Sequence, residues 1–314
     1  MTEPLLKVRQ LRVEFGRHAA VRDVDFDLHA GETLGLVGES GSGKSSLARA
    51  LLRLIDAAGG SVHFRGEDLL SCPRTRLREL RRDLQIVFQN PTASLNPRMR
   101  IGDAVAEPLS IFEHGLDVPA RRAQVAEMLE RVGLHADLAG RYPHELSGGQ
   151  CQRVAIARAM IMKPKLLICD EPVSSLDVSI QGQIVNLLSD LKIQFGTALL
   201  FISHNLAVVR HLSERIMVLY EGRCVELAAR DELYARPLHP YTQALLAAAA
   251  GMQTASLAAV SQTAPAAAGC LYRDRCSVAI EICRTLDPPL SEVIPRRFAA
   301  CHRAREFCQA GQLA

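Results

Sequence analysis

The sequence has no tryptophan, few aromatic residues of any kind and no long apolar segment. Only 4% of its 314 residues are Phe, Trp or Tyr, and no run reaches the roughly 18 apolar residues of a membrane-spanning helix. Lysine is scarce, since five of the 37 Lys and Arg residues are Lys. The formal net charge of +3 gives no argument from bulk charge for binding nucleic acid. Any role at a membrane is therefore expected to come through a partner.

Nine cysteines are present, which is an odd number. The first ten residues are polar and lack the apolar segment of a secretory signal. We therefore expect reduced thiols or metal ligands in a cytosolic protein rather than a disulfide framework. With 48% hydrophobic residues the chain is expected to fold as one large domain or two smaller ones.

Strand-like and helix-like segments alternate along most of the chain. Residues 33–37 and 166–169 are short apolar runs typical of buried strands, and 197–203 is a third. Helical patterns follow Lys44, fill about 95–160 and return over 180–193. This alternation predicts a parallel sheet covered by helices. From about residue 236 the composition changes to an Ala, Ser, Thr and Gln stretch over 253–268 and then to cysteine, which predicts a separate small module behind a linker.

A phosphate-binding loop follows the first buried strand. Its pattern is G-x-x-x-x-G-K-S, with the helical pattern directly after it. Glycine lets phosphate oxygens approach backbone N–H groups, and the helix N-terminus adds a partial positive charge. Lys44 would contact the β- and γ-phosphates, and the Ser45 hydroxyl would bind Mg²⁺. The predicted nucleotide-binding residues here are Gly38, Glu39, Ser40, Gly41, Ser42, Gly43, Lys44, Ser45 and Ser46.

Two carboxylates and a histidine follow other predicted strands. Asp170 would hold Mg²⁺ through its water shell, while Glu171 would act as general base on the attacking water. The alternative is a pair of acids that makes only surface contacts. His204 follows the strand over 197–203, where it would contact the γ-phosphate unless it is a structural hydrogen-bond donor.

The segment Leu-Ser-Gly-Gly-Gln at 146–150 carries a resemblance to the ATP-binding cassette (ABC) ATPases. Ser147 lies 103 residues after Lys44 and 23 before Asp170, as the family signature does. The resemblance covers roughly residues 5–235 and implies a P-loop (RecA-like) α/β core with an antiparallel β subdomain and a helical subdomain at about 92–162. It implies that Phe15 stacks on adenine, that Gln89 senses Mg²⁺ and the attacking water, and that His204 is the switch histidine. Further nucleotide contacts implied are Ser147, Gly148, Gly149, Gln150 and, in the D-loop, Asp177.

The resemblance also implies how such a chain works. Two ATPase domains meet head to tail, so that each ATP lies between one phosphate loop and the signature of the other subunit. Cys151 and Asn205 depart from the usual residues after the signature and after the switch histidine, but neither position carries chemistry directly.

Two segments resemble the importers of oligopeptides, dipeptides and nickel, namely 87–103 and 237–242. The implied partners are two integral-membrane permease subunits, a homologous second ATPase and, indirectly, a solute-binding protein, at the cytoplasmic face of the inner membrane and without nucleic acid. The implied reaction is ATP hydrolysis with Mg²⁺, and its solute stays open among peptide, nickel and glutathione-like molecules. The alternatives are a soluble ABC ATPase acting on DNA or ribosomes and an iron–sulfur regulatory ATPase.

The last part of the chain, 236–314, concentrates cysteine in the spacing C-x5-C-x6-C-x17-C. Cys270, Cys276, Cys283 and Cys301 suit either tetrahedral Zn²⁺ or a 4Fe-4S cluster, although the tight pairs of most zinc sites are absent. The other interpretation is that they are reduced cysteines packed as small hydrophobic residues. The resemblance favours a 4Fe-4S cluster. A basic run over 73–82 has no interleaved aromatic residue and predicts a solvated helix face.

Overall fold

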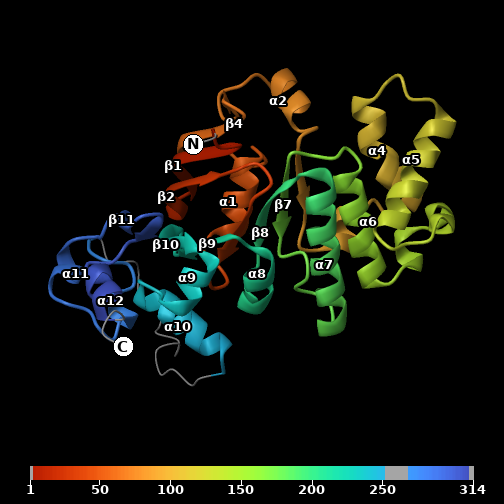
Figure 1. Cartoon of the computed structure of the whole chain (residues 1–314). Helices are drawn as coiled ribbons and strands as arrows, with labels where there is room; N and C mark the ends of the chain where they lie inside the picture. The colour runs from red at the N-terminus through yellow and green to blue at the C-terminus, as the bar shows by residue number, and fades with distance from the viewer. Residues whose placement is uncertain (1–2, 252–267, 311–314) are drawn as a thin grey trace.

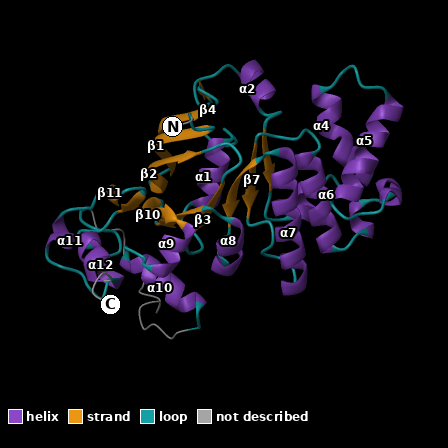
Figure 2. Cartoon of the chain, viewed as in Figure 1, coloured by secondary structure: helices purple, strands orange, loops and turns teal. Residues whose placement is uncertain are grey.

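A computed structural model describes residues 3–251 and 268–310, and its centre is an eight-stranded sheet (Figures 1 and 2). In spatial order the strands are β11 (Ser291–Ile294), β12 (Arg297–Ala299), β10 (Arg223–Ala229), β9 (Arg215–Tyr220), β3 (Thr33–Val37), β8 (Ala198–Ile202), β7 (Leu166–Asp170) and β6 (Leu84–Val87). The five strands from β9 to β6 are parallel, and the pairings beyond β9 are antiparallel. The predicted parallel sheet is therefore present.

The sheet separates two hydrophobic cores, and each parallel strand contributes side chains to both, because successive side chains leave a strand on opposite faces. Leu34 and Leu36 of β3 enter one core, together with Leu47 of α1 (Lys44–Leu51). Leu167 and Cys169 of β7 enter the other core. Burial on both faces explains why these strands are continuous apolar runs in the sequence.

The first core is closed by a second, antiparallel sheet and short helices. Its strands, in order, are β2 (His18–Leu28), β1 (Leu6–Phe15), β4 (Gly59–Phe64) and β5 (Glu67–Asp68). Here the apolar residues alternate, so that Leu6, Val8, Val24 and Phe26 are buried while their neighbours are more exposed. Helix α2 (Arg74–Leu80) adds Leu77 and Leu80 to this core.

The second core is covered by helices, and much of it lies in a helical region drawn in yellow and green in Figure 1. That region contains the predicted helical segment, at α3 (Pro91–Ser94), α4 (Ile101–Phe112), α5 (Val118–Arg131), η1 (Ala136–Gly140), η2 (Pro143–Glu145) and α6 (Gly148–Met160). Helices α7 (Val178–Phe195) and α8 (Leu206–Leu212) pack on the same face of the sheet.

The C-terminal part is not separate from the sheet, which differs from the expectation of a detached module. Helix α9 (Arg230–Ala235) leads into it, and it contains α10 (Pro240–Ala249), η4 (Arg273–Arg275), α11 (Ile282–Thr285) and α12 (Ala304–Ala310). Its strand β12 pairs with β10 through Glu226–Ala299 and Leu227–Phe298, so the extension lengthens the main sheet. Sequence patterns do not reveal this pairing because the strands are more than 60 residues apart and short. The expected linker, 253–268, lies outside the described residues except for its last position.

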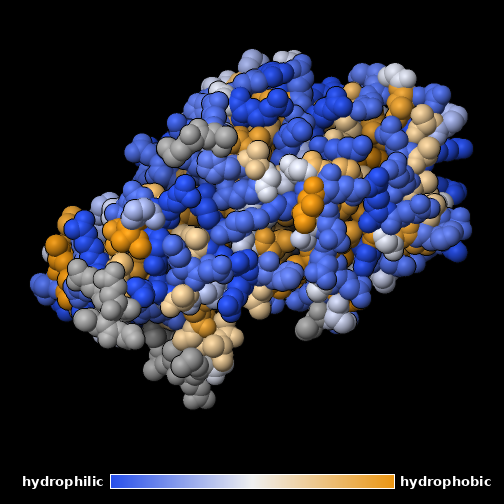
Figure 3. All heavy atoms as spheres, viewed as in Figure 1, coloured by the Kyte–Doolittle hydropathy of each residue, from blue (hydrophilic) through white to orange (hydrophobic). Residues whose placement is uncertain are grey.

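The face shown in Figure 3 is largely hydrophilic, with small hydrophobic areas, one of them over the extension near α11. Ile280, Ile282 and Leu286 are exposed there. In the described ranges no helix has both the length and the apolarity needed to cross a bilayer. The basic run lies on the exposed helix α2, where Arg76 pairs with Glu79 at 2.6 Å, in agreement with a solvated face.

Candidate functional site

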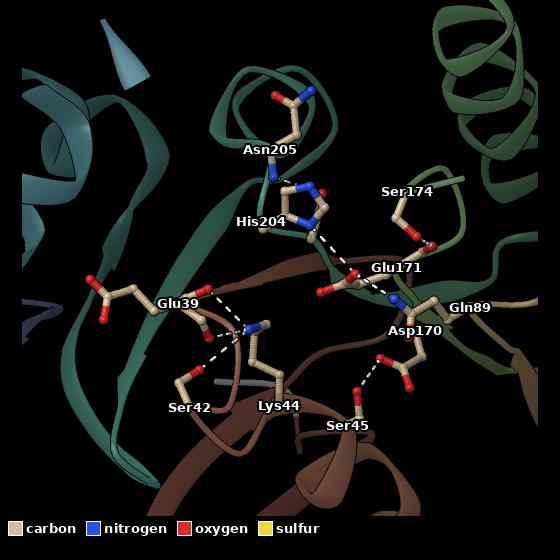
Figure 4. A network of polar contacts seen from close by, with 12 residues as sticks. Glu39, Ser42, Lys44, Ser45, Gln89, Asp170, Glu171, Ser174, His204 and Asn205 are labelled. Carbon is tan, nitrogen blue, oxygen red and sulfur yellow. Dashed lines mark hydrogen bonds and ion pairs between the residues drawn. The ribbon is translucent and has the colours of Figure 1, made fainter. Parts of the chain in front are cut away.

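Four neighbouring parallel strands have their carboxyl ends at one edge of the sheet, and predicted site residues lie at or directly after each end. In the order β3, β8, β7 and β6, these are the phosphate loop, His204, Asp170 with Glu171, and Gln89. Carboxyl ends of parallel strands are where open α/β sheets bind ligands. Figure 4 shows these side chains converging on the phosphate loop.

The phosphate loop is shaped by backbone contacts that only glycine permits. Gly43 has φ of 100° and is the N-cap of α1, and a Cβ there would lie 2.1 Å from the carbonyl oxygen of Ala20. A Cβ on Gly38 would lie 2.2 Å from the carbonyl oxygen of Leu219. The loop is thus wedged between β2 and β9, which leaves its N–H groups at the N-terminus of α1 for an anion.

Lys44 is nearly buried and bonds to its own loop. Its Nζ donates to the carbonyl oxygens of Gly38 and Glu39 at 2.9 and 2.7 Å and lies 3.3 Å from Ser42 Oγ. Burial lowers the pKa of Lys44, and the nearby Glu171 and Asp170 carboxylates oppose that shift. Among the other loop residues, Ser40 and Gly41 are exposed, while Ser45 and Ser46 are half-buried at the start of α1.

Ser45 and Asp170 meet as expected for a Mg²⁺ site. The Ser45 hydroxyl donates to Asp170 Oδ1 at 2.9 Å, and the Asp170 side chain is 2% exposed (Figure 4). Burial raises the pKa of Asp170, and the Ser45 hydrogen bond opposes this. A hydroxyl and a carboxylate that meet beside a phosphate loop are the oxygen ligands that Mg²⁺ takes in such sites, so the donor set fits the ion.

Glu171 is the centre of a second polar group. Its Oε2 accepts a hydrogen bond from Gln89 Nε2 at 2.9 Å and lies 3.4 Å from His204 Nδ1. Its backbone has φ of 47°, which a non-glycine residue rarely adopts, and its N–H donates to Ile202 on the neighbouring strand at 3.0 Å. With this strained backbone the carboxylate faces Gln89 and His204. Strained backbone conformations of this kind cluster at functional sites. The structure therefore brings together the four predicted catalytic residues, Glu171, His204, Gln89 and Lys44.

The signature residues lie at the exposed N-terminus of α6. Ser147 caps the helix by accepting from Gln150 N–H at 3.3 Å, and Gln150 Oε1 accepts from Ser147 N–H at 2.9 Å. Gly149 approaches Ile180 of α7, so the signature lies next to the segment that contains Asp177, itself exposed. Across residues 3–251 and 268–310, no hydrogen bond joins the signature to the phosphate loop. One chain thus does not bring its two predicted phosphate-binding surfaces together.

Phe15 is 52% exposed at the end of β1. Its neighbour Glu14 pairs with Ala19, and the adjacent Ala20 is the residue that touches Gly43. The predicted adenine-stacking ring is therefore on the hairpin beside the phosphate loop, with a face available for a flat ligand.

The two departures from the family pattern have local structural roles. Asn205 caps α8, with its Oδ1 accepting from Ala207 N–H at 3.1 Å. Cys151 is 1% exposed and packs in the second core. Neither lies in the polar group around Glu171.

Four cysteines of the extension line one small cavity. Cys270, Cys276, Cys283 and Cys301 all border it, beside Tyr272 and His239. Nevertheless, no three or more His, Cys, Asp or Glu side chains in the described part of the chain are arranged as a ready metal site. The donor types gathered at the cavity suit a thiolate-bound group, while their present arrangement does not form one. Cys169 and Cys224 are buried elsewhere as packing residues, and burial raises the pKa of each thiol.

Two residues near the phosphate loop were missed by the motifs. Tyr241 of α10 accepts a hydrogen bond from Glu39 N–H at 2.9 Å, and Arg275 of η4 donates twice to the Glu39 carboxylate at 2.9 and 2.8 Å. Both come from the extension, about 200 residues or more after the loop. No local sequence pattern could link them to it.

Two family models match the chain. Residues 21–174 match the model described as ABC transporter, and residues 225–283 match the one described as oligopeptide/dipeptide transporter, C-terminal region. Among solved structures, the dimeric post-hydrolysis ATP-binding cassette MJ0796 bound to ADP and Pi is similar, with a TM-score of 0.66 and 28% identity. The similarity covers 72% of this chain and 98% of that one. The fold class predicted from the motifs is confirmed.

Relatives match over nearly the whole chain. The oligopeptide transport ATP-binding protein OppF of Haemophilus influenzae is 47% identical, with 90% of this chain and 88% of that protein covered. The di/tripeptide transport ATP-binding protein DppF of Pseudomonas aeruginosa is 48% identical, with 93% of each chain covered. The chain therefore belongs to the ABC transporter ATP-binding proteins of the oligopeptide/dipeptide importer family.

Proposed function

We propose that this chain is the ATP-hydrolysing subunit of an importer for di- and oligopeptides or a related small solute. The observation that carries the proposal is the edge of the main sheet, where Lys44, Asp170, Glu171 and His204 converge from three adjacent strands. The relatives are named for oligopeptide and di/tripeptide transport, and the extension matches a region described for such transporters. Peptide is therefore the cargo class best supported.

Each residue of the edge has a role in hydrolysis. The N–H groups of the loop and Lys44 bind the phosphates, and Ser45 with Asp170 would hold Mg²⁺, which neutralises developing charge on the phosphates. Glu171 orients and polarises the attacking water as a general base. Gln89 and His204 both lie next to Oε2 of Glu171, so they would fix the position of this carboxylate when the γ-phosphate is present.

Two ATPase subunits are needed for a complete site. The Ser147 signature is exposed and capped, and it presents a helix N-terminus that suits an anion. Because it does not reach the phosphate loop of its own chain, it would complete the site of a second, homologous ATPase in a head-to-tail pair. ATP would close this pair and hydrolysis would reopen it.

The membrane partners would dock beside Gln89. A groove of about 270 Å³ is bordered by Phe88, Pro108 and Ile111, with the Arg158–Glu107 ion pair at 2.6 Å in its wall. Phe88 is the neighbour of Gln89, so an occupant of this groove would act directly on the residue that contacts Glu171. We infer that a cytoplasmic segment of one of two permease subunits occupies it, which would place this chain peripherally on the cytoplasmic face of the inner membrane. A solute-binding protein acts on the other side.

The test is ATPase activity of the complex reconstituted with two permease subunits and the second ATPase. Hydrolysis should rise when a peptide-loaded binding protein is added, because cargo arrival must be coupled to closure of the ATPase pair. The chain should also co-purify with two polytopic membrane proteins. Activity indifferent to these partners, or co-purification with DNA or ribosomes, would contradict the importer and favour a soluble ABC ATPase.

We further propose that the four cysteines around this cavity ligate a 4Fe-4S cluster once their thiols rearrange to surround it. Support comes from Cys270, Cys276, Cys283 and Cys301 bordering one cavity although they are spread over 32 residues. Anaerobically purified full-length protein should carry stoichiometric iron and sulfide and absorb visible light. A Cys276→Ser variant should lose both, whereas Cys72→Ser should not. A colourless, zinc-loaded or metal-free preparation would contradict the cluster.

A further inference from the structure

The phosphate loop contains an acidic residue next to its first glycine. Glu39 places a carboxylate in a loop whose predicted ligand is a triphosphate anion. Its charge acts on Lys44 together with those of Glu171 and Asp170, so it lies within electrostatic range of the phosphate-binding ammonium group. Left uncompensated, this carboxylate would repel the γ- and β-phosphates.

The extension neutralises this carboxylate. Arg275 donates from both terminal nitrogens to the two Glu39 oxygens, at 2.9 and 2.8 Å, in a two-pronged pair whose arginine side chain is 18% exposed. The carboxylate in turn raises the pKa of Arg275, so the guanidinium keeps its charge in this contact. Such fork-shaped pairs fix orientation as well as charge.

The same extension also holds the backbone of Glu39. Tyr241 accepts from the Glu39 N–H at 2.9 Å, and the Glu39 carbonyl oxygen accepts from Lys44 Nζ at 2.7 Å. Glu39 is thus fixed through its N–H, its carbonyl and its side chain. A shift of Arg275 or Tyr241 would be transmitted through one residue to the lysine that binds phosphate.

Two aromatic rings lie against the Arg275 guanidinium, and a third packs on both of them. Its guanidinium lies 5.7 Å from the ring centre of Tyr220 and 5.6 Å from that of Tyr272. Tyr220 and Tyr241 pack at 4.6 Å, and each packs against Tyr272, at 5.2 and 5.4 Å. Tyr220 ends β9, next to the strand that precedes the phosphate loop, so the cluster ties the extension to the sheet at this point.

We propose that Arg275 is a positioning residue for ATP, which neutralises Glu39 and holds the phosphate loop in its nucleotide-binding shape. This inference rests on the proposed ATP site, and it assigns to the cysteine-rich extension a direct part in nucleotide affinity. Arg275 lies on η4 between Cys270 and Cys276, so the segment that borders the cysteine cavity is also the one that contacts the phosphate loop.

The experiment measures the Kd of ATP and of ADP for the full-length chain, together with KM and kcat for hydrolysis by the assembled ATPase pair. Arg275→Ala should weaken ATP binding at least about tenfold, because a charged two-pronged contact is lost and the Glu39 carboxylate is left uncompensated within electrostatic range of Lys44 and the phosphates. The loss should be smaller for ADP, which lacks the γ-phosphate, and should shrink as salt rises. KM should rise while kcat changes less than about threefold, since no group at Glu171 is altered.

Removing the Glu39 charge distinguishes an electrostatic role of Arg275 from a packing role. In Glu39→Gln/Arg275→Ala the repelling carboxylate is gone, so ATP affinity should return to within about threefold of Glu39→Gln alone. Arg275→Lys keeps the charge but not the fork and should be intermediate. Arg284→Ala, at an arginine of the same extension that is 75% exposed, is the matched control and should bind ATP as the unmodified chain does.

The proposal is overturned if Arg275→Ala binds ATP with unchanged affinity. It is equally overturned if the double variant binds as weakly as Arg275→Ala, because the defect would then be loss of packing and not charge. Since Kd is measured without turnover, a chain that binds ATP but does not hydrolyse it in the complex refutes the importer function and leaves this test intact.

Discussion

We predict that the buried carboxylate of Glu226 anchors the extension to the main sheet. Glu226 lies on β10 with an exposed fraction of 0%, and its two oxygens accept from the N–H groups of Leu238 and His239 at 2.8 and 2.9 Å. Arg297, on the strand next to β10, lies 4.0 Å away and is 5% exposed. The segment that begins the extension therefore depends on a side chain of the main sheet for its backbone hydrogen bonds.

Glu226→Gln changes almost no volume but removes one acceptor. The amide oxygen can accept from one N–H, while the amide NH₂ faces the other, so one charge-assisted bond is lost and a buried donor is left without a partner. We expect a loss of about 3 kcal/mol in the free energy of unfolding. Glu226→Ala leaves the N–H groups of Leu238 and His239, and the Arg297 guanidinium, without the carboxylate. It should lower the free energy of unfolding by on the order of 3–5 kcal/mol.

Thermal and urea unfolding of the purified chain measure these losses. For a chain of 314 residues, 3 kcal/mol corresponds to a Tm lower by roughly 4–6 °C. Glu232→Gln is the matched control, because Glu232 is 48% exposed and lies 3.7 Å from the same Arg297. Its loss should be about 0–1 kcal/mol. If Glu226→Gln unfolds at the same temperature as Glu232→Gln, the carboxylate does not anchor the extension and the reasoning is refuted.

Two further predictions concern turnover and pairing of the ATPase subunits. Glu171→Gln should lower kcat by about 10²- to 10⁴-fold while ATP binding persists, because the general base is lost and the phosphate loop is untouched; phosphate release and equilibrium binding measure the two effects. Ser147→Arg should block ATP-driven pairing, seen by size-exclusion chromatography, while the single subunit still binds ATP, because the exposed signature would carry a bulky cation where the partner's nucleotide must approach.

The predictions for Glu171→Gln and Ser147→Arg each have a result that would contradict them. Turnover of Glu171→Gln within tenfold of the unmodified chain would remove Glu171 from the role of general base. Ser147→Ala loses the same helix cap as Ser147→Arg, at a cost of about 1 kcal/mol, without adding bulk or charge. Equal pairing by the arginine variant and the unmodified chain would show that the signature does not face the partner's nucleotide.

The local patterns of the sequence were sufficient to predict the family and the fold, and they supplied the residues of the candidate nucleotide site. The phosphate loop lies between a buried strand and a helix, and its glycines are needed for close backbone approach at Gly38 and Gly43. The acids and His204 directly follow apolar runs that became β7 and β8. These signals are short range, because strand burial, helix caps and loop conformation are each determined within a few residues.

Only the tertiary structure determined which distant groups meet. The order β3, β8, β7, β6 brings Gln89 within 2.9 Å of Glu171, although 82 residues separate them. The pairing of β12 with β10 joins the expected separate module to the sheet. The contact of Arg275 with Glu39 spans 236 residues. No local pattern encodes such contacts, because they arise from sheet order and from burial of the tyrosines that hold the two segments together. The sequence by itself determined which residues form the candidate ATP site, whereas the tertiary structure decided that the cysteine-rich extension contacts its phosphate loop.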